Sequence, residues 1–87
     1  PLRRLGKQLG CEKIMLKKQR MALYLVSNIK SAYYQSQTFD LLLNFITAYP
    51  RRCNLREANG KRSVVIDQVK SVEEGVAILE KIKTINS

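Results

Sequence analysis

Lysine and arginine are the residues of this chain whose number and spacing suggest a chemistry. They number 16 against 7 aspartates and glutamates, so the net charge is +9, and the chain has no histidine. One cluster lies beside a single acid, Glu12, and consists of Arg3, Arg4, Lys7, Lys13, Lys17, Lys18 and Arg20. A second cluster consists of Arg51, Arg52, Arg56, Lys61 and Arg62. Such cations can neutralise phosphates with salt-dependent affinity, or they can meet an acidic protein surface. Composition leaves nucleic acid and protein open as partners.

Aromatic side chains could decide between these partners, because modules that bind single-stranded nucleic acid stack bases on exposed rings amid cations. Phe39, Phe45 and Tyr49 fall in a predicted helix, and Tyr24 falls in an apolar strand. The pair Tyr33-Tyr34 falls in a predicted loop, where such pairs more often pack over the edge of a core. The sequence has no GXXG clamp, aromatic RNP pattern or zinc knuckle. The nucleic-acid interpretation therefore rests on charge alone.

Catalytic and metal-binding chemistry has little support in the residue types. Without histidine, the chain lacks the usual general base, the commonest metal ligand and the Ser-His and Cys-His nucleophile pairs. Two separated cysteines and scattered carboxylates have no zinc-site spacing, and the glycines at positions 6 and 10 lack the spacing of a phosphate-binding loop. We therefore expect no catalytic residue, no metal and no cofactor. Cys11 and Cys53 could form one disulfide, but their low density favours buried free thiols in a reducing compartment.

Hydrophobic periodicity predicts a helix over residues 1–10, followed by two strands. The helix is indicated by apolar residues at helical spacing and a glycine stop signal: Leu2, Leu5, Leu9 and Gly10. A short strand is predicted over 13–17, with a polar turn to residue 20. Residues 21–26 are almost continuously apolar, which predicts a strand that is interior or buried on both faces.

A second helix is predicted after the polar segment 27–36. Ser36 is its expected N-cap, and Pro50 ends it because the residue before a proline is disfavoured in helical conformation. The face that we expect to pack on the core is an apolar stripe at three- and four-residue spacing: Phe39, Leu42, Leu43, Ile46 and Tyr49.

The clearest local signal is a hairpin at Asn59-Gly60, because these residues tolerate the positive φ of a type I′ turn. Its strands are predicted over 53–57 and 63–67. Ser71 and Glu74 then form a capping box, in which the Ser71 hydroxyl accepts from the Glu74 backbone and Glu74 reaches back. The third helix continues to the C-terminus with apolar spacing at Val72, Val76, Leu79 and Ile82.

The predicted order of elements is α-β-β-α-β-β-α, which places the chain in the α+β class. The expected architecture is a mainly antiparallel sheet of about four strands with helices packed on one face. Gly75 would let the last helix approach the sheet closely. The 87 residues suit one domain, 1–87. A start at Pro1 without an initiator methionine or a signal region, and the lack of a membrane-spanning apolar run, predict a fragment of a larger cytoplasmic protein.

The order of sequence features carries a family resemblance. A helix runs straight into the strand that begins Cys11-Glu12-Lys13-Ile14, and an apolar strand, a loop, a helix, Pro50, a hairpin and a final helix follow. In this order, along essentially all 87 residues, the chain resembles the C-terminal TRCF domain of bacterial transcription-repair coupling factor, whose first helix ends in K-L-G. The segments 33–36 and 59–63 are similar to the Bacteroidetes variant.

The resemblance implies a regulatory domain without catalysis of its own. The parent of this family is an ATP-driven DNA translocase that removes stalled RNA polymerase from a lesion and recruits the UvrA damage sensor. ATP and magnesium bind in the parent's motor domains. The C-terminal domain docks on the parent's N-terminal UvrB-like module, masks the UvrA-binding surface and restrains the motor until RNA polymerase is engaged. Such docking biases a closed–open equilibrium.

Interface residues are not transferred from the family, because part of its docking surface is an acidic segment that would precede Pro1. We predict instead that exposed cations form or steer the interface: Arg3, Arg4, Lys17, Lys18, Arg20, Arg51, Arg52, Lys61 and Arg62. A double charge reversal at Arg51 and Arg52 is expected to weaken docking without unfolding the domain. The alternative function is a stand-alone basic nucleic-acid-binding α+β module.

Overall fold

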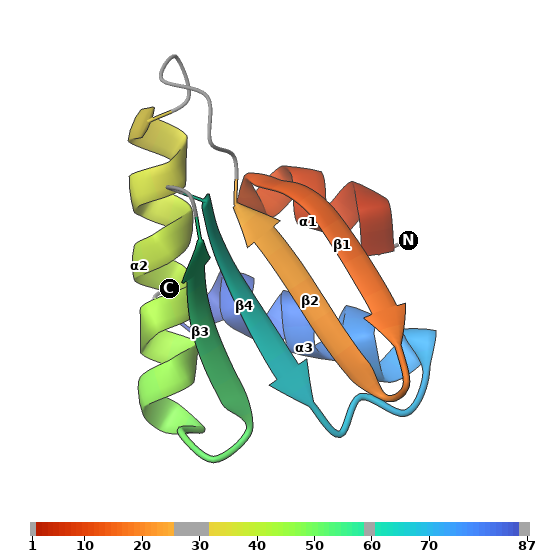
Figure 1. The fold of residues 1–87 in the computed structure, drawn as a ribbon. Coiled ribbons are helices and arrows are strands. Elements are labelled where there is room, and N and C mark those ends of the chain that lie inside the picture. The colour runs from red at the N-terminus through yellow and green to blue at the C-terminus, as the bar shows by residue number, and fades with distance from the viewer. Residues whose placement is uncertain (1, 26–31, 59–60, 86–87) are drawn as a thin grey trace.

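Three helices and one sheet make up the residues that the computed structural model describes, 2–25, 32–58 and 61–85, with 32–38 as backbone only. In chain order the elements are α1 (Leu2–Leu9), β1 (Cys11–Lys17), β2 (Arg20–Leu25), α2 (Ala32–Ala48), β3 (Cys53–Ala58), β4 (Lys61–Asp67) and α3 (Val72–Thr84). The predicted order and the α+β class are confirmed. The 4-stranded sheet is antiparallel with the order β1-β2-β4-β3, so each hairpin supplies one central and one edge strand (Figure 1).

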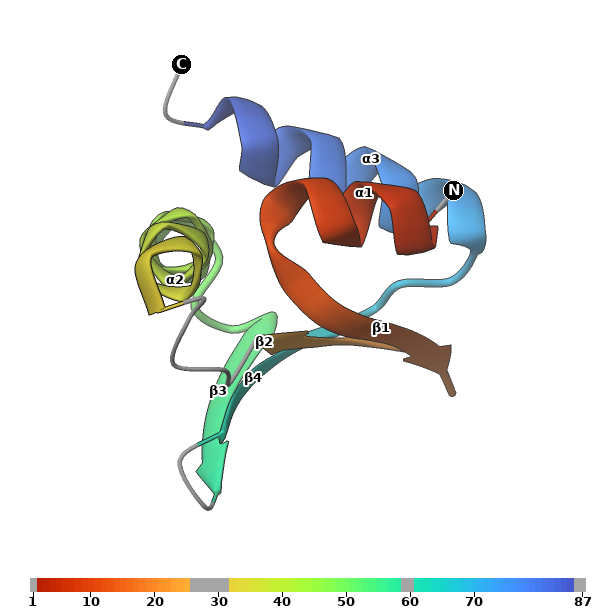
Figure 2. The same cartoon turned by 90° about the horizontal axis from the view of Figure 1, so that it is seen from above.

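The helices all lie on one face of the sheet. Figure 2 shows α1 and α3 side by side above the half of the sheet that contains β1, while α2 lies above the opposite edge, near β3. In the described part of the chain, no element covers the other face. An antiparallel sheet tolerates this arrangement because one face can pack on the core while the other meets water.

The core lies between the sheet and the three helices. The two central strands supply side chains that are at most 1% exposed: Met21, Leu23, Leu25, Val64 and Ile66. The helices supply Leu42, Phe45, Ile78, Leu79 and Ile82. The prediction that β2 is interior is confirmed, but burial on both faces is wrong, because its residues alternate and Tyr24 is 38% exposed. Val26 lies outside the described residues.

Helix α2 differs from its prediction in its start and in its buried face. It begins at Ala32, so Ser36 lies inside the helix and does not cap it, and Tyr33-Tyr34 is helical instead of part of a loop. The side chains of these residues lie outside the described part. Leu43, predicted to be in the core stripe, is 37% exposed, whereas Phe45 is 1% exposed. The helix is therefore rotated about its axis relative to the orientation that the spacing suggested, so that Phe45 and not Leu43 faces the core.

Helix α3 begins and packs nearly as predicted. The Ser71 hydroxyl accepts from the Glu74 backbone N–H at 3.1 Å, but the Glu74 carboxylate accepts from the backbone of Lys70 and not from that of Ser71. Val72 is 43% exposed, so the buried stripe begins later, at Gly75. A Cβ on Gly75 would lie 3.2 Å from the Met21 sulfur, which confirms the predicted close approach to the sheet.

Both hairpins have two-residue turns. Ala58 pairs with Lys61, which confirms the predicted second hairpin, although residues 59–60 themselves lie outside the described part. In the first hairpin Lys17 pairs with Arg20, and Lys18 and Gln19 have φ values of 52° and 61°. Two successive positive φ values are the geometry of a type I′ turn, here without glycine.

Candidate binding face of the sheet

The face of the sheet opposite the helices is built from alternate residues of every strand. Since Met21, Leu23 and Leu25 are buried in the core, the pleat turns the residues between them to the open face. Strand register aligns these residues in rows across the sheet. One row runs Lys13, Tyr24, Ser63, Arg56. The next runs Met15, Ala22, Val65, Asn54. A third runs Lys17, Arg20, Asp67.

Tyr24 stands between two hollows of this face. One has a volume of about 380 Å³, and its lining includes Met15, Lys17, Arg20, Ala22, Tyr24 and Arg56. The other has a volume of about 510 Å³ and is lined by Glu12, Lys13, Tyr24, Leu25, Lys61 and Arg62. Tyr24 therefore lines both hollows, so a flat ligand in either of them could contact its ring.

Positive charge dominates the open face. Its cations are Lys13, Lys17, Arg20, Arg56 and Lys61. Within the described rows, Asp67 is the one carboxylate, and it lies 3.3 Å from the Arg20 guanidinium. Both side chains of that pair are about half exposed or more, so the pair is worth little and leaves Arg20 able to exchange partners. The Lys13 Nζ lies 6.0 Å from the centre of the Tyr24 ring, at the outer limit of a cation–π contact.

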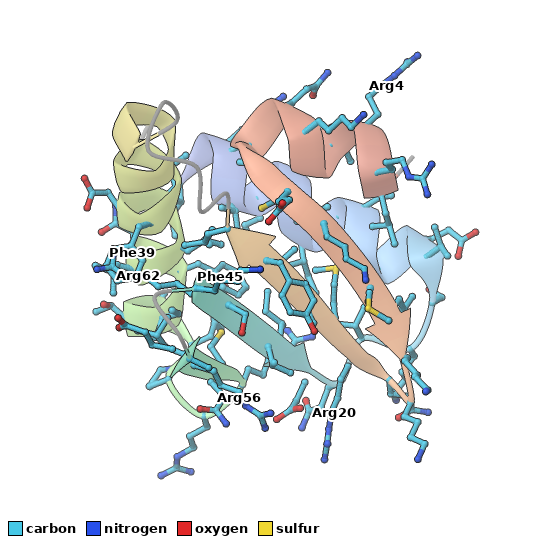
Figure 3. The ribbon with its side chains drawn as sticks, turned by 45° about the horizontal axis from the view of Figure 1, so that its top comes forward. Arg4, Arg20, Phe39, Phe45, Arg56 and Arg62 are labelled. Atoms are coloured by element: carbon cyan, nitrogen blue, oxygen red, sulfur yellow. The ribbon has the colours of Figure 1, made fainter. Side chains whose placement is uncertain are left out.

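The predicted interface residues do not form one surface. Lys17, Lys18 and Arg20 lie at the β1–β2 turn and reach the open face. Arg3 and Arg4 are exposed on α1. Figure 3 shows Arg4 directed away from the sheet, while Arg20 and Arg56 project from it. The first basic cluster of the sequence is thus divided between a helix surface and the sheet.

Arg52 is part of the fold and not a free interface cation. Its Nε donates to the Asp67 carbonyl and its Nη2 donates to the Gln68 carbonyl, both at 3.2 Å. Its own carbonyl accepts from the Asp67 backbone N–H at 2.8 Å. Arg51, by contrast, is exposed in the same turn. Reversing the charge of both arginines would therefore also remove hydrogen bonds at the end of β4, so a loss of docking in that variant would not report on charge alone.

Lys61 and Arg62 point to opposite sides of the sheet. Lys61 pairs with Ala58 on the open face, as the alternation along β4 requires. The Arg62 guanidinium lies 4.5 Å from the centre of the Phe39 ring, on the helix side (Figure 3). Its Nε also lies 3.9 Å from a carboxylate oxygen of Glu57. Arg62 therefore packs against α2 and is not a free cation of the open face.

The open face also contains residues that the sequence reasoning did not select. Tyr24 is 38% exposed, although its strand was interpreted as apolar, and Met15, on the short strand before it, is 40% exposed. Lys13 and Arg56 were counted as charge but were not placed among the interface candidates. The signal that could have found them is the alternation of Arg20, Ala22 and Tyr24, which the apolar run over 21–26 conceals.

Cys11 and Cys53 are free thiols, as predicted. Cys11 is 4% exposed, and burial raises the pKa of its thiol from 9.0 to about 11. Burial also raises the pKa of the half-buried Cys53 thiol, which the adjacent Arg52 partly offsets. Thiolate is the reactive form, so both thiols are suppressed in the folded state, and Cys11 the more strongly.

We expect a thiol-specific reagent at about pH 8 to label Cys53 before Cys11, and Cys11 only after denaturant is added. The raised pKa of Cys11 also has a consequence for stability. The protonated thiol is favoured in the folded state, so this contribution is complete below pH 9.0 and is lost towards pH 11 as the unfolded chain ionises first. Mass spectrometry of the labelled peptides checks the order, and equal labelling rates would contradict it.

Other kinds of site have no counterpart among the described residues. No group of three or more His, Cys, Asp or Glu in this part of the chain could hold a metal ion. Its helices are all too short or too polar to cross a membrane. Comparison with protein-family models, curated proteins and solved structures finds no match to this chain. The resemblance to the TRCF domain therefore stays a prediction from the sequence.

Proposed function

We propose that the chain is a regulatory domain of a transcription-repair coupling factor. It acts in the cytoplasm by docking on the N-terminal UvrB-like module of its parent, where it masks UvrA binding. The observation that carries this proposal is the order of elements along the whole chain. The helix that ends at Gly10, the apolar strand β2, the helix that stops before Pro50, the second hairpin and the final helix occur in the order expected from the resemblance.

The proposed mechanism needs binding energy and no chemistry. When docked, the domain stabilises the closed state of the parent and restrains its ATP-driven motor. RNA polymerase engagement favours the open state, which releases the domain and exposes the UvrA-binding surface. A domain can shift such an equilibrium only by the difference in its binding free energy to the two states. UvrA, RNA polymerase and DNA are thus indirect partners, and ATP and magnesium act in the parent's motor domains.

The docking surface is tested with charge reversals on two separate surfaces. One variant carries Arg3→Glu and Arg4→Glu on α1, and the other carries Lys17→Glu and Lys18→Glu at the β1–β2 turn. All of these side chains are exposed, so the fold is retained. We expect one of the pairs to weaken binding to the isolated UvrB-like module about tenfold or more, which corresponds to about 1.4 kcal/mol.

Isothermal titration calorimetry measures the affinity, and a competition assay with UvrA measures masking. Arg51→Glu serves as a third reversal that leaves the hydrogen bonds of Arg52 in place. If the wild-type domain neither binds the module nor competes with UvrA, the proposed function is wrong. If all three variants bind like the wild type, docking uses a surface other than the basic ones.

A further inference from the structure

The open face of the sheet has a composition that docking through charge alone does not require. An exposed tyrosine lies on its central strand β2 and an exposed methionine on the neighbouring edge strand β1, with cations at their sides. We propose that this face binds single-stranded RNA, with Tyr24 as the platform on which one base stacks. This activity is additional to docking and does not depend on it.

Along their row, Tyr24, Ser63 and Arg56 are in the order needed to contact the base, the ribose and the phosphate of one nucleotide. Neighbouring strands lie about 5 Å apart, so Ser63 is one step from Tyr24 and Arg56 is two steps, about 10 Å, away. A base stacked on the Tyr24 ring thus has its ribose near the Ser63 hydroxyl and its phosphate near the Arg56 guanidinium. The hydroxyl can bond the ribose 2′-OH, the group by which proteins distinguish RNA from DNA.

The next row of the open face, which contains Met15 and Ala22, can contact the neighbouring nucleotide of the RNA. Met15 and Ala22 provide an apolar floor beside the ring, in the hollow of about 380 Å³ that Arg56 also lines. Lys17 and Arg20 at the end of that hollow can contact a further phosphate. On the other side, Lys61 and Lys13 line the second hollow with Tyr24, together with one carboxylate, Glu12. Cations therefore flank the stacking platform on both sides, as required for a strand that passes across the face.

The alternatives explain less of this surface. A duplex hides the faces of its bases and cannot stack on an exposed ring, since stacking platforms take unpaired bases. An acidic polypeptide would use the cations but would not need an exposed aromatic ring between them. Two carboxylates oppose either ligand: Asp67, whose charge Arg20 already offsets, and Glu12, which lines the second hollow beside Lys13.

The test is fluorescence anisotropy with a labelled single-stranded RNA of about ten nucleotides and its deoxyribose counterpart. Tyr24→Leu removes the ring and Tyr24→Phe keeps it. We expect the leucine variant to bind about 5- to 150-fold more weakly and the phenylalanine variant to bind within about twofold of the wild type, since stacking contributes about 1–3 kcal/mol per base. Circular dichroism melts verify that both variants are folded.

A matched pair of charge variants separates the site from overall charge. Arg56→Ala and Arg4→Ala lower the net charge equally, but only Arg56 lies on the open face (Figure 3). We expect Arg56→Ala to reduce the slope of log K against log salt by about 0.7, and Arg4→Ala to leave it unchanged. Equal effects of the two variants, equal binding of Tyr24→Leu and Tyr24→Phe, or DNA binding as tight as RNA would each overturn the proposal. Displacement of the RNA by an equal concentration of polyglutamate would assign the face to an acidic polypeptide instead.

Discussion

Replacement of Phe45 with alanine is expected to lower the free energy of unfolding by about 3–5 kcal/mol. Phe45 is 1% exposed in the core and its ring centre lies 4.8 Å from that of Tyr49. The substitution leaves a cavity between α2 and the sheet that the surrounding strands cannot fill. A domain of 87 residues has a total stability of roughly 4–13 kcal/mol, so this one change removes a large part of it.

Leu43→Ala on the same helix is the matched control. Leu43 is 37% exposed, so its loss is expected to cost less than about 1 kcal/mol. Urea denaturation followed by circular dichroism measures both variants, since α2 contributes to the helical signal. A cost for Leu43→Ala equal to that for Phe45→Ala would mean that α2 packs through the stripe predicted from spacing, and not through the face seen in the structure.

Removal of the Arg52 side chain is expected to cost about 1–3 kcal/mol, which is the range for hydrogen bonds from a charged donor. The guanidinium joins the turn before β3 to the carbonyls at the end of β4, which are 15 and 16 residues away in the chain. Without these contacts, the segment that leads to α3 is still held by Val69, which is buried in the core and donates to the Gln19 carbonyl, so we expect a partial loss of stability. The half-buried bond to Asp67 accounts for more of the cost than the exposed bond to Gln68.

Arg51→Ala is the neighbouring control. It changes the charge equally, but among the described hydrogen bonds none joins the Arg51 side chain to the end of β4. Its effect on stability is expected to stay within about 0.5 kcal/mol, as for most exposed substitutions. The two variants are compared by thermal melting and by urea titration at the same ionic strength. Equal stabilities of Arg51→Ala and Arg52→Ala would show that the Arg52 contacts contribute nothing measurable.

Local signals predicted the elements well because the physics behind them is local. The hairpin at 58–61, the Ser71 cap and the end of α2 before Pro50 each depend on the conformational preferences of a few adjacent residues. The predicted start of α2, after Ser36, was wrong for a related reason. A serine in a polar segment is a good cap only if the chain before it is not already helical, and the structure continues the helix back to Ala32.

The spacing of apolar residues determined the order of elements and the α+β class, and composition determined the strong basic character of this chain. Only the tertiary structure decided that Phe45 instead of Leu43 faces the core, and that Tyr24, Ser63 and Arg56 share one row. An apolar run has the same composition whether one face of its strand is covered or both are. The pairing of β2 with β4 joins residues 39 to 47 positions apart, which no local preference encodes. For this reason the cations were visible in the sequence, but the surface that they form around Tyr24 was not.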